Sequence, residues 1–439
     1  MISGLINLTF HETIKMKTYQ EASRYFAEIF KNLSVEEFKN RLSPKKGESL
    51  KLPNNIYVNN DLIEKRWDII NNSDAKAIIL DHQTKQEMSV YERNIENFIG
   101  TVNVPVGLAG PLRINGLFAQ GDYYVPLATT EAALVASYSR GAQLITAAGG
   151  GSTAVINKGI CRAPGFILEN LTKAILFVNW IVNITDELKM VARTTTSHGE
   201  LVDIKVTMEG NYVFVNFDYF TADASGQNMI TIATQKICEY IMENSPVTPE
   251  KYFIEGNLSG DKKASSLSFL GVRGKKVISE VIIKQELVRK FLRTTPEEMI
   301  TFWKMSTVGA ILLGTTGFNG HFANGLTALY IACGQDAACV VESAVGITRM
   351  EVQNGGDLYV SVSLPNVMVG TVGGGTGLPS QKSCLDILNL SGENNSMAFA
   401  EVAAATVLAG ELSIAGAITA GDFTHAHQAL SRDCVLSRV

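Results

Sequence analysis

The chain has 439 residues, of which 46% are hydrophobic and 18% are charged, a balance typical of folded globular proteins and not of largely disordered ones. Its 38 basic and 43 acidic residues give a formal net charge of −5 without any long basic run, so we do not expect a nucleic-acid partner. At roughly 100–200 residues per domain, this length predicts two or three domains.

The six cysteines are scattered and form no C-x-x-C pair. This usage favours reduced thiols in a cytoplasmic protein over a disulfide framework or a zinc site. The first residues lack the pattern of a signal peptide. Two apolar segments, 174–184 and 400–421, contain asparagines or glutamates, so we expect packed helices and no membrane span.

Residues 1–95 are rich in charge and predict a small helical N-terminal region. Ser34 and Glu37 have the spacing of a capping box. Segment 59–72 places Trp67 and other apolar residues at helical intervals, and a polar connection with two prolines, 41–55, precedes it.

Segments 96–163 and 265–439 are expected to form one large, helix-rich domain. Residues 103–117 are rich in glycine and show short strand patterns with turns. Residues 125–151 predict a helix with Thr129 or Thr130 as its N-cap and the glycines at 149–151 as its end.

Residues 164–254 give the clearest local pattern, a strand, a long helix over 171–191, a hairpin over 201–220, a second helix over 225–244 and a strand over 251–255. The order β-α-β-β-α-β is that of a ferredoxin-like unit. The polar residues 255–264 connect it back to the large domain. The predicted fold class is therefore α+β, with a ferredoxin-like unit inserted into a large domain.

Four stretches carry ionisable residues among small neighbours. Glu131 stands in the predicted first turn of a helix, either as a helix-dipole acid or, if buried, as a general acid. The loop 259–265 contains two lysines, and a lysine placed over a carbonyl stabilises an oxyanion. Asp336 lies in an apolar run, which favours a polar cluster over a surface acid. His425 and His427 suit proton transfer better than metal binding, because no companion ligands are visible.

The segment Gly370–Pro379 contains five glycines within eight residues, so its backbone is expected to approach something closely. It matches neither the G-x-G-x-x-G dinucleotide fingerprint nor a P-loop, since Thr376 stands where a P-loop has lysine.

Six segments together resemble the signature motifs of 3-hydroxy-3-methylglutaryl-CoA (HMG-CoA) reductases. They are ENFIGTVNVPVGLAGPL, ATTEAALVAS, DASGQNMI, GNLSGDKKAS, GQDAACV and GTVGGGTGLPSQKSCL, in the order of that family. The resemblance covers residues 90–433 and is closest to soluble, prokaryotic-type members, without a membrane anchor.

The resemblance implies reduction of HMG-CoA to mevalonate and CoA by two hydride transfers from NAD(P)H, without a metal. Lys262 would polarise the thioester carbonyl and Glu131 would donate a proton to the aldehyde intermediate. Asp336 would lie between these two groups and tune both. His427, preferred over His425, would protonate the departing CoA thiolate.

The resemblance also assigns binding residues. Those for HMG-CoA are Arg162, Asn257, Asp261, Lys263, Asn324, Ser137 and Arg140, with Asn324 orienting the lysine and the last two meeting CoA. Those for the cofactor are Thr196, Ser197, His198, Asp223, Gly226, Asn228, Gly373, Gly374 and Gly375. The family builds its active site between two subunits, so at least a homodimer is expected.

Departures from the animal motifs leave NADPH and NADH both open as cofactors. Thr196-Ser197-His198 replaces a triplet whose arginine suits the 2′-phosphate of NADP, although Arg193 or His198 could take that part. Ser225 and Gln227 replace methionines. Two alternatives to the reductase remain, an inactive CoA-thioester binding protein and a reductase of another acyl-CoA. The direction of flux stays open.

Overall fold

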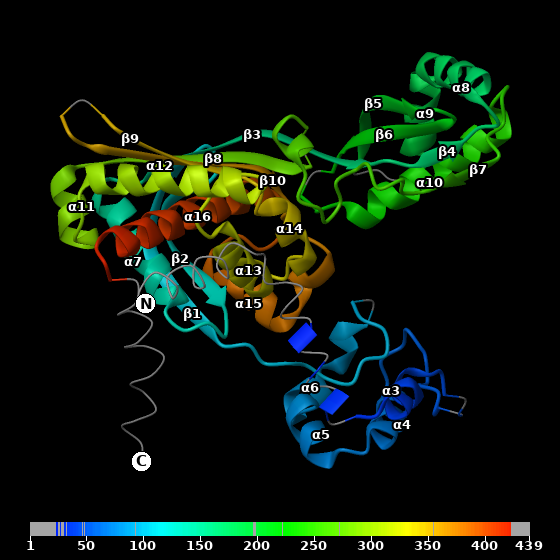
Figure 1. The fold of residues 1–439 in the computed structure, drawn as a ribbon, viewed down its shortest axis with the longest axis horizontal. Coiled ribbons are helices and arrows are strands. Elements are labelled where there is room, and N and C mark those ends of the chain that lie inside the picture. The colour runs from blue at the N-terminus through cyan, green and yellow to red at the C-terminus, as the bar shows by residue number, and fades with distance from the viewer. Residues whose placement is uncertain are drawn as a thin grey trace, which may run out of the picture.

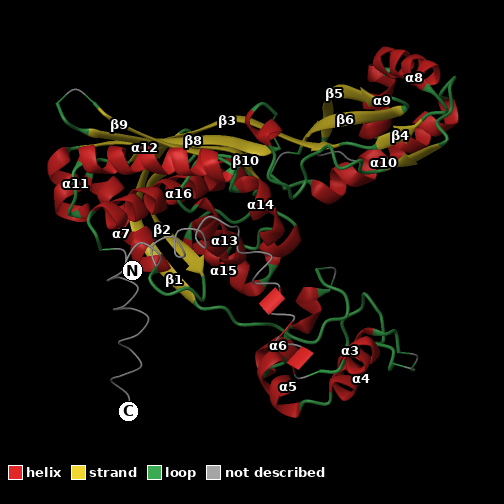
Figure 2. Ribbon diagram, in the orientation of Figure 1, coloured by secondary structure: helices red, strands yellow, loops and turns green. Residues whose placement is uncertain are grey.

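A computed structural model describes residues 23–422 except for gaps at 25–26, 28–29, 32, 46, 48, 93, 196–198, 222, 272 and 354. A helical N-terminal unit, a large sheet with its helices and a smaller sheet with its own helices are arranged side by side (Figures 1 and 2). The mixed α+β class predicted from the sequence is confirmed.

The described part of the N-terminal unit consists of short helices. Ser34 and Glu37 form the capping box, with the Glu37 amide 3.2 Å from Ser34 Oγ and the Ser34 amide 2.9 Å from Glu37 Oε2. Its elements are α3 (Val35–Leu42), α4 (Asn60–Ile70), α5 (Ser73–Ile79), α6 (His82–Gln86) and the 3-10 turn η1 (Met88–Tyr91).

Helix α4 organises a small core of this unit. Trp67 packs with Val58, Ile63, Leu80 and Phe98, separately from the main core. Its indole Nε1 donates to the carbonyl of Ile99 at 2.9 Å, which ties the helix to the segment leading into the large sheet. The helix predicted around Trp67 is therefore confirmed.

The large sheet has the strand order β2-β1-β3-β8-β10-β9. Strands β1 and β3 pair in parallel, and the other neighbours pair antiparallel. The bounds are β1 (Val106–Gly116), β2 (Gln120–Ala128), β3 (Gly151–Arg162), β8 (Gly274–Ile283), β9 (Ile347–Val352) and β10 (Leu358–Val367).

Helices pack beneath this sheet in the view of Figure 1. They are α7 (Leu134–Ala147), α11 (Gln285–Leu292), α12 (Pro296–Leu313), α13 (Phe322–Ala332), α14 (Val340–Ser343), α15 (Pro379–Ile387) and α16 (Ser396–Thr419). Among the described helices, α16 alone is long and apolar enough to span a membrane, but 83% of its most apolar window is buried inside the protein. It therefore serves as the central core helix, as expected for segment 400–421.

The smaller sheet continues from the large one, because the end of β3 pairs with β6. Its strand order is β7-β4-β6-β5, all antiparallel. The elements are β4 (Gly165–Ile167), α8 (Leu171–Asn183), α9 (Thr185–Arg193), β5 (Glu200–Glu209), β6 (Tyr212–Phe220), α10 (Gln227–Asn244) and β7 (Lys251–Phe253).

One predicted element of this unit is wrong. The single helix expected over 171–191 is two helices, α8 and α9, which meet at Ile184. Asn183 donates to the carbonyl of Asn179 and Thr185 donates to that of Val182. Such local side-chain hydrogen bonds compete with helix continuation.

Candidate active site

The loop between β7 and β8 carries the predicted catalytic lysine. Lys262 adopts a positive φ of 55°, as does Asn257 at 66°, in a region that non-glycine residues seldom occupy. Lys262 Nζ lies 2.9 Å from Asp336 Oδ2, and both side chains keep more than 40% of their surface exposed, at 42% and 46%. Strained backbone conformations persist only where the surrounding structure enforces them, and they are concentrated at functional sites.

The electrostatics keep this pair ionised. The hydrogen bond that Lys262 donates to Asp336 raises the pKa of Lys262, with burial acting in the opposite direction. Burial tends to raise the pKa of Asp336, but the hydrogen bonds from Lys262 and from the Ala338 amide outweigh it, so that pKa is lowered. The loop therefore presents a protonated ammonium to the solvent-accessible side.

Two buried arginines lie beneath the loop. Arg162 Nη1 lies 3.0 Å from Asp261 Oδ2 and 3.2 Å from Glu255 Oε2. Arg273 Nη2 reaches the other oxygen of Asp261 at 2.5 Å. The predicted residues Arg162, Asp261 and Lys262 therefore belong to one cluster with Asp336, which we call the lysine group. Lys263 is exposed and donates to the Asp261 carbonyl at 3.1 Å.

Other predicted residues gather around helix α7, and we call Glu131, Ser137, Arg140 and Asn324 the α7 group. Glu131 is exposed and precedes the helix. The predicted N-cap is wrong, because α7 begins at Leu134 after Ala133 in a left-handed conformation at φ 70°. Thr129 Oγ1 accepts the Glu131 amide at 3.0 Å in a local turn instead of capping the helix.

A buried tyrosine sets the spacing of the helices that carry the α7 group. A Cβ on Gly325 of α13 or on Gly410 of α16 would lie 2.5 Å from Tyr138, so glycine at both positions admits the ring. Ser137 Oγ and Arg140 both bond to Ser413 of α16, at 2.8 Å and 2.8–3.1 Å. The three helices are thus locked together around this group.

His321 was missed in the sequence. Its Nε2 lies 2.9 Å from the carbonyl of Gly410, which can only accept, so Nε2 carries the proton. Its Nδ1 then accepts from the Asn324 amide at 3.4 Å. The signal was available, because His321 stands three residues before Asn324 at the start of one helix. Ser413 lacked any such signal.

The two groups are not joined within one chain. Across the residues that the structure describes, no hydrogen bond or ion pair links the Glu131 side chain to Lys262 or to Asp336. Asp336 was expected to lie between Glu131 and Lys262, and the structure shows its contact with Lys262. The part that involves Glu131 stays a prediction.

The glycine-rich segment borders a pocket of ≈ 310 Å³ beside Asp336. At some positions of the segment only glycine fits, because a Cβ would overlap neighbouring backbone atoms. A Cβ on Gly370 would lie 2.8 Å from the Ser225 amide, and one on Gly375 would lie 2.8 Å from the Gly334 carbonyl. Gly373 and Gly374 have positive φ and open space where a Cβ would stand, so they leave room along the pocket.

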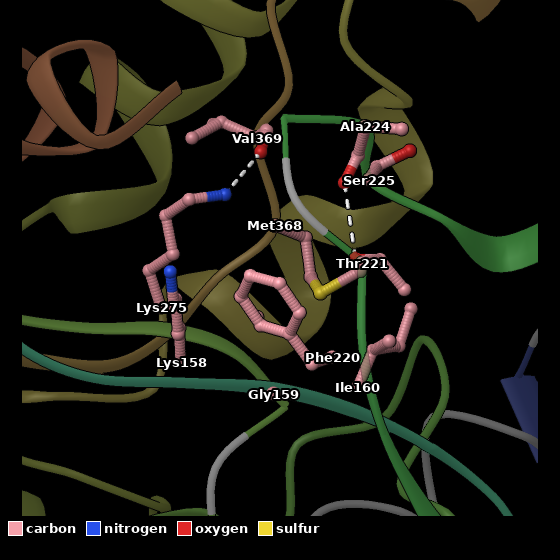
Figure 3. A pocket seen from close by; sticks show the side chains of 11 residues that line it. Lys158, Gly159, Ile160, Phe220, Thr221, Ala224, Ser225, Lys275, Met368 and Val369 are labelled. Atoms are coloured by element: carbon pink, nitrogen blue, oxygen red, sulfur yellow. Dashed lines mark hydrogen bonds between the residues drawn. The ribbon is translucent and has the colours of Figure 1, made fainter. Parts of the chain in front are cut away.

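A buried lysine supports the start of this segment. Figure 3 shows Lys275 directed at the carbonyl of Val369, which its Nζ meets at 2.8 Å, with Lys158 close by. Burial lowers the pKa of Lys275 to about 8; Asp223 opposes this shift and Lys158 adds to it. This contact fixes the residue directly before Gly370.

Some of the predicted cofactor residues lie in the described part of the chain, and others lie outside it. Asp223 accepts the amides of Asn394 at 2.8 Å and Ser396 at 3.3 Å, so its carboxylate holds the start of α16. Gly226, at φ 76°, is the N-cap of α10, and Asn228 lies in the first turn of that helix. Thr196, Ser197, His198, His425 and His427 lie outside the described residues. In the described part of the chain, no cluster of metal-ligating side chains occurs.

The chain was compared with known proteins. Residues 62–432 match the family model described as hydroxymethylglutaryl-coenzyme A reductase. A 3-hydroxy-3-methylglutaryl-coenzyme A reductase of Aeropyrum pernix is 44% identical over 366 residues, covering 82% of this chain and 86% of the relative. That of Methanocaldococcus jannaschii is 42% identical, covering 81% and 88%.

Solved structures show the same fold. The 3-hydroxy-3-methylglutaryl-coenzyme A reductase of Streptococcus pneumoniae superposes with a TM-score of 0.62 at 19% identity, covering 81% of this chain and 96% of that one. A class II structure from the same organism, bound to NADPH in open conformations, gives a TM-score of 0.61, with 81% and 86% covered.

Proposed function

The chain belongs to the hydroxymethylglutaryl-coenzyme A reductase family, and from that membership we propose how its residues divide the work of the reaction. It is an oxidoreductase of the mevalonate pathway that reduces HMG-CoA. In balance, HMG-CoA, two reduced nicotinamide cofactors and two protons give mevalonate, free CoA and two oxidised cofactors. The cofactor supplies both hydrides when bound.

Lys262 is the group that we assign to the carbonyl oxygen, and its contact with Asp336 is the observation that carries the proposal. Each reduction places negative charge on that oxygen, and an ammonium nearby stabilises the charge. The positive φ at Lys262 and the ion pair at 2.9 Å hold the ammonium beside the glycine-rich pocket. No metal is needed for this polarisation.

Proton transfers are assigned to two other residues, and a third supports the lysine. Asp336 keeps Lys262 charged, Glu131 donates to the oxygen of the aldehyde intermediate, and His427 protonates the CoA thiolate. The exposure of Glu131 is consistent with a donor whose partner comes from outside the single chain.

Substrate binding is assigned to residues of the β7–β8 loop, to Arg162 and to three residues of the α7 group. Asn257, Asp261 and Lys263 belong to the loop and would lie near the carboxylate end of HMG-CoA, and Arg162 would bind the substrate. Arg162 is suited to this part because its Nε is buried without a hydrogen-bond partner, although its Nη1 is shared by two carboxylates. Asn324 would orient the lysine, and Ser137 and Arg140 would meet CoA.

The cofactor would lie between the smaller sheet and the glycine-rich pocket. The strand order β7-β4-β6-β5 supports a ferredoxin-like unit over residues 164–254, inserted between 96–163 and 265–439 through the loop 255–264, with 1–95 as the N-terminal region. The open space at Gly373 and Gly374 fits the close approach of a nucleotide. Asp223, Gly226 and Asn228 are assigned to the cofactor because they flank Ser225 and Gln227, which line the pocket.

We propose NADPH as the preferred cofactor, with NADH as the alternative. The S. pneumoniae relative binds NADPH. Arg193, a candidate for the 2′-phosphate, pairs with Glu200 at 2.8 Å with both side chains exposed, so an incoming phosphate could compete for it. Thr196, Ser197 and His198 are assigned to the same end of the cofactor.

A homodimer in the cytoplasm completes the proposal. Within the described residues no hydrogen bond or ion pair joins the Glu131 side chain to Lys262, which supports a site shared by two subunits. One face of α12 also exposes a row of apolar side chains that a second chain would cover, namely Met305, Val308, Ile311, Leu312 and Leu313.

The test follows the absorbance of NADPH and, in parallel, NADH with purified protein and HMG-CoA. Oxidation that requires HMG-CoA and consumes two cofactors per CoA released supports the reductase. Oxidation with another acyl-CoA alone would identify a different reductase. Binding of HMG-CoA without oxidation would identify an inactive binding protein.

A further inference from the structure

We propose that Arg273 and Glu342 are positioning residues that fix the loop carrying Lys262. This inference rests on the proposed role of Lys262, and neither residue was expected to take part from the sequence. They are among the most buried charged residues in the described chain, with side chains 3% and 0% exposed.

Arg273 joins three separate segments. Its Nε donates to Glu342 Oε2 at 2.6 Å, its Nη1 to the Cys161 carbonyl at 2.9 Å and its Nη2 to Asp261 Oδ1 at 2.5 Å. One planar guanidinium thus connects the end of β3, the short helix α14 and the loop residue directly before Lys262.

Glu342 completes the link to the lysine itself. Its second oxygen, Oε1, faces the backbone amide of Lys262 at 3.4 Å. The two carboxylate oxygens therefore divide their partners, one holding Arg273 and the other the lysine's own backbone. Because Lys262 sits in a strained left-handed conformation, an external acceptor at its amide helps to keep it there.

The charges support each other. Burial opposes the charge on Arg273, but Glu342 and Asp261 outweigh it and raise the pKa of that guanidinium. Burial raises the pKa of Glu342, with Arg273 acting against this shift. Without Arg273, Glu342 would therefore take up a proton more readily and hold the loop less firmly.

Two matched substitutions separate positioning from general stability. Glu342→Gln keeps the shape of the side chain but replaces one accepting oxygen with an NH2 group. That NH2 group would face another donor, either Arg273 or the Lys262 amide. Glu401→Gln is the control, because Glu401 is equally buried and accepts amides of the β1–β2 turn, such as Phe118 at 2.9 Å and Ala119 at 2.8 Å, away from the loop. The readouts are melting temperature, kcat, the dissociation constant of NADPH and amide hydrogen exchange in 258–264.

For E342Q we expect kcat to fall by about tenfold to a hundredfold, an unchanged NADPH dissociation constant and faster exchange in 258–264. For E401Q we expect a lower melting temperature and kcat within about twofold of wild type. If E342Q does not fold, Arg273→Lys takes its place, because a single ammonium cannot reach all three partners of the arginine.

The proposal is overturned if E342Q keeps its kcat and slow exchange, or if E401Q loses as much kcat as E342Q. Failure of the wild type to oxidise NADPH with HMG-CoA would instead remove the proposed function. The exchange measurement does not depend on turnover, so it still reports whether Glu342 holds the loop.

Discussion

The lysine group and the α7 group are stabilised in different ways. In the lysine group, charged side chains pair inside a single chain: Lys262 pairs with Asp336, and Asp261 pairs with the buried Arg162 and Arg273. In the α7 group, helix packing around Tyr138 fixes the backbone while the carboxylate of Glu131 faces solvent. Within the described residues, the charged groups of the first group are paired, whereas the Glu131 side chain of the second is joined to neither Lys262 nor Asp336 by a hydrogen bond or ion pair.

The difference fits our proposal that each chain contributes to two different active sites. A carboxylate beside an ammonium favours its charged form and fixes its position, which is what Asp336 does for Lys262. A general acid must meet the substrate, so Glu131 needs no internal partner. Two copies related by a two-fold axis would bring each half to the other.

The largest expected effect falls on the lysine. Lys262→Ala should lower kcat by about a thousandfold, because the developing oxyanion loses its ammonium. Lys263→Ala is the neighbouring control and should raise the KM for HMG-CoA while kcat changes little. Steady-state kinetics of both variants measures this. A K262A enzyme that keeps a tenth of its kcat would remove Lys262 from the chemistry.

The partner of the lysine should matter nearly as much for rate and little for stability. Asp336→Asn should lower kcat by about a hundredfold, while the melting temperature moves by less than about 4 °C, since half-exposed ion pairs stabilise weakly. Asp357→Asn removes the carboxylate of another ion pair, with Lys284, and should leave kcat unchanged. Equal loss of kcat in both variants would contradict a specific role for Asp336.

Some elements of the fold could be predicted from the sequence and others could not, for physical reasons. Capping boxes, hairpins and helix spacing are local, so the N-terminal helices and the hairpin over 201–220 could be predicted. The start of α7 could not, because Ala133 in a left-handed conformation breaks the usual N-cap rule. The break at Ile184 depends on side-chain hydrogen bonds that compete with an otherwise continuous helical pattern.

Site residues that lie in a sequence motif could be predicted. Residues whose role depends on contacts between distant segments could not. Lys262 and Asp336 lie in recognisable motifs, and the structure brings them together. Glu342 lies in the apolar run CVVESAVG, where a buried carboxylate requires a partner, but its partner Arg273 lies 69 residues away in sequence. Such long-range pairings become visible only in the fold.

A smaller effect should appear on the glycine-rich segment that borders the lysine group. Gly370→Ala should raise the KM for NADPH by about tenfold and lower the melting temperature, because its Cβ would overlap the backbone at Ser225. Gly377→Ala meets open space at ordinary φ and should change neither quantity. A normal KM in G370A would show that this close approach does not shape the cofactor site.

The smallest effect concerns pH and stability at Asp223. Burial opposes its ionisation, but the amides of Asn394 and Ser396 outweigh burial and lower its pKa below the ordinary 3.8. A carboxylate with a lowered folded-state pKa stabilises the protein above the unfolded value and loses that contribution as pH falls. Wild type should therefore melt above Asp223→Asn by about 3 °C near neutral pH, and the gap should shrink below about pH 4. Calorimetry across pH measures the gap, and a gap independent of pH would contradict this reading.

The central claim is that the lysine group of one subunit and the α7 group of the other form one active site. The direct measurement is the HMG-CoA-dependent oxidation of NADPH by a mixture of Lys262→Ala and Glu131→Gln chains, refolded or expressed together. Each variant alone should be nearly inactive, whereas random mixing should restore about a quarter of wild-type activity, because half of the dimers then contain one intact site. Mixed dimers that form but recover no activity would show that both residues serve the same site from one chain.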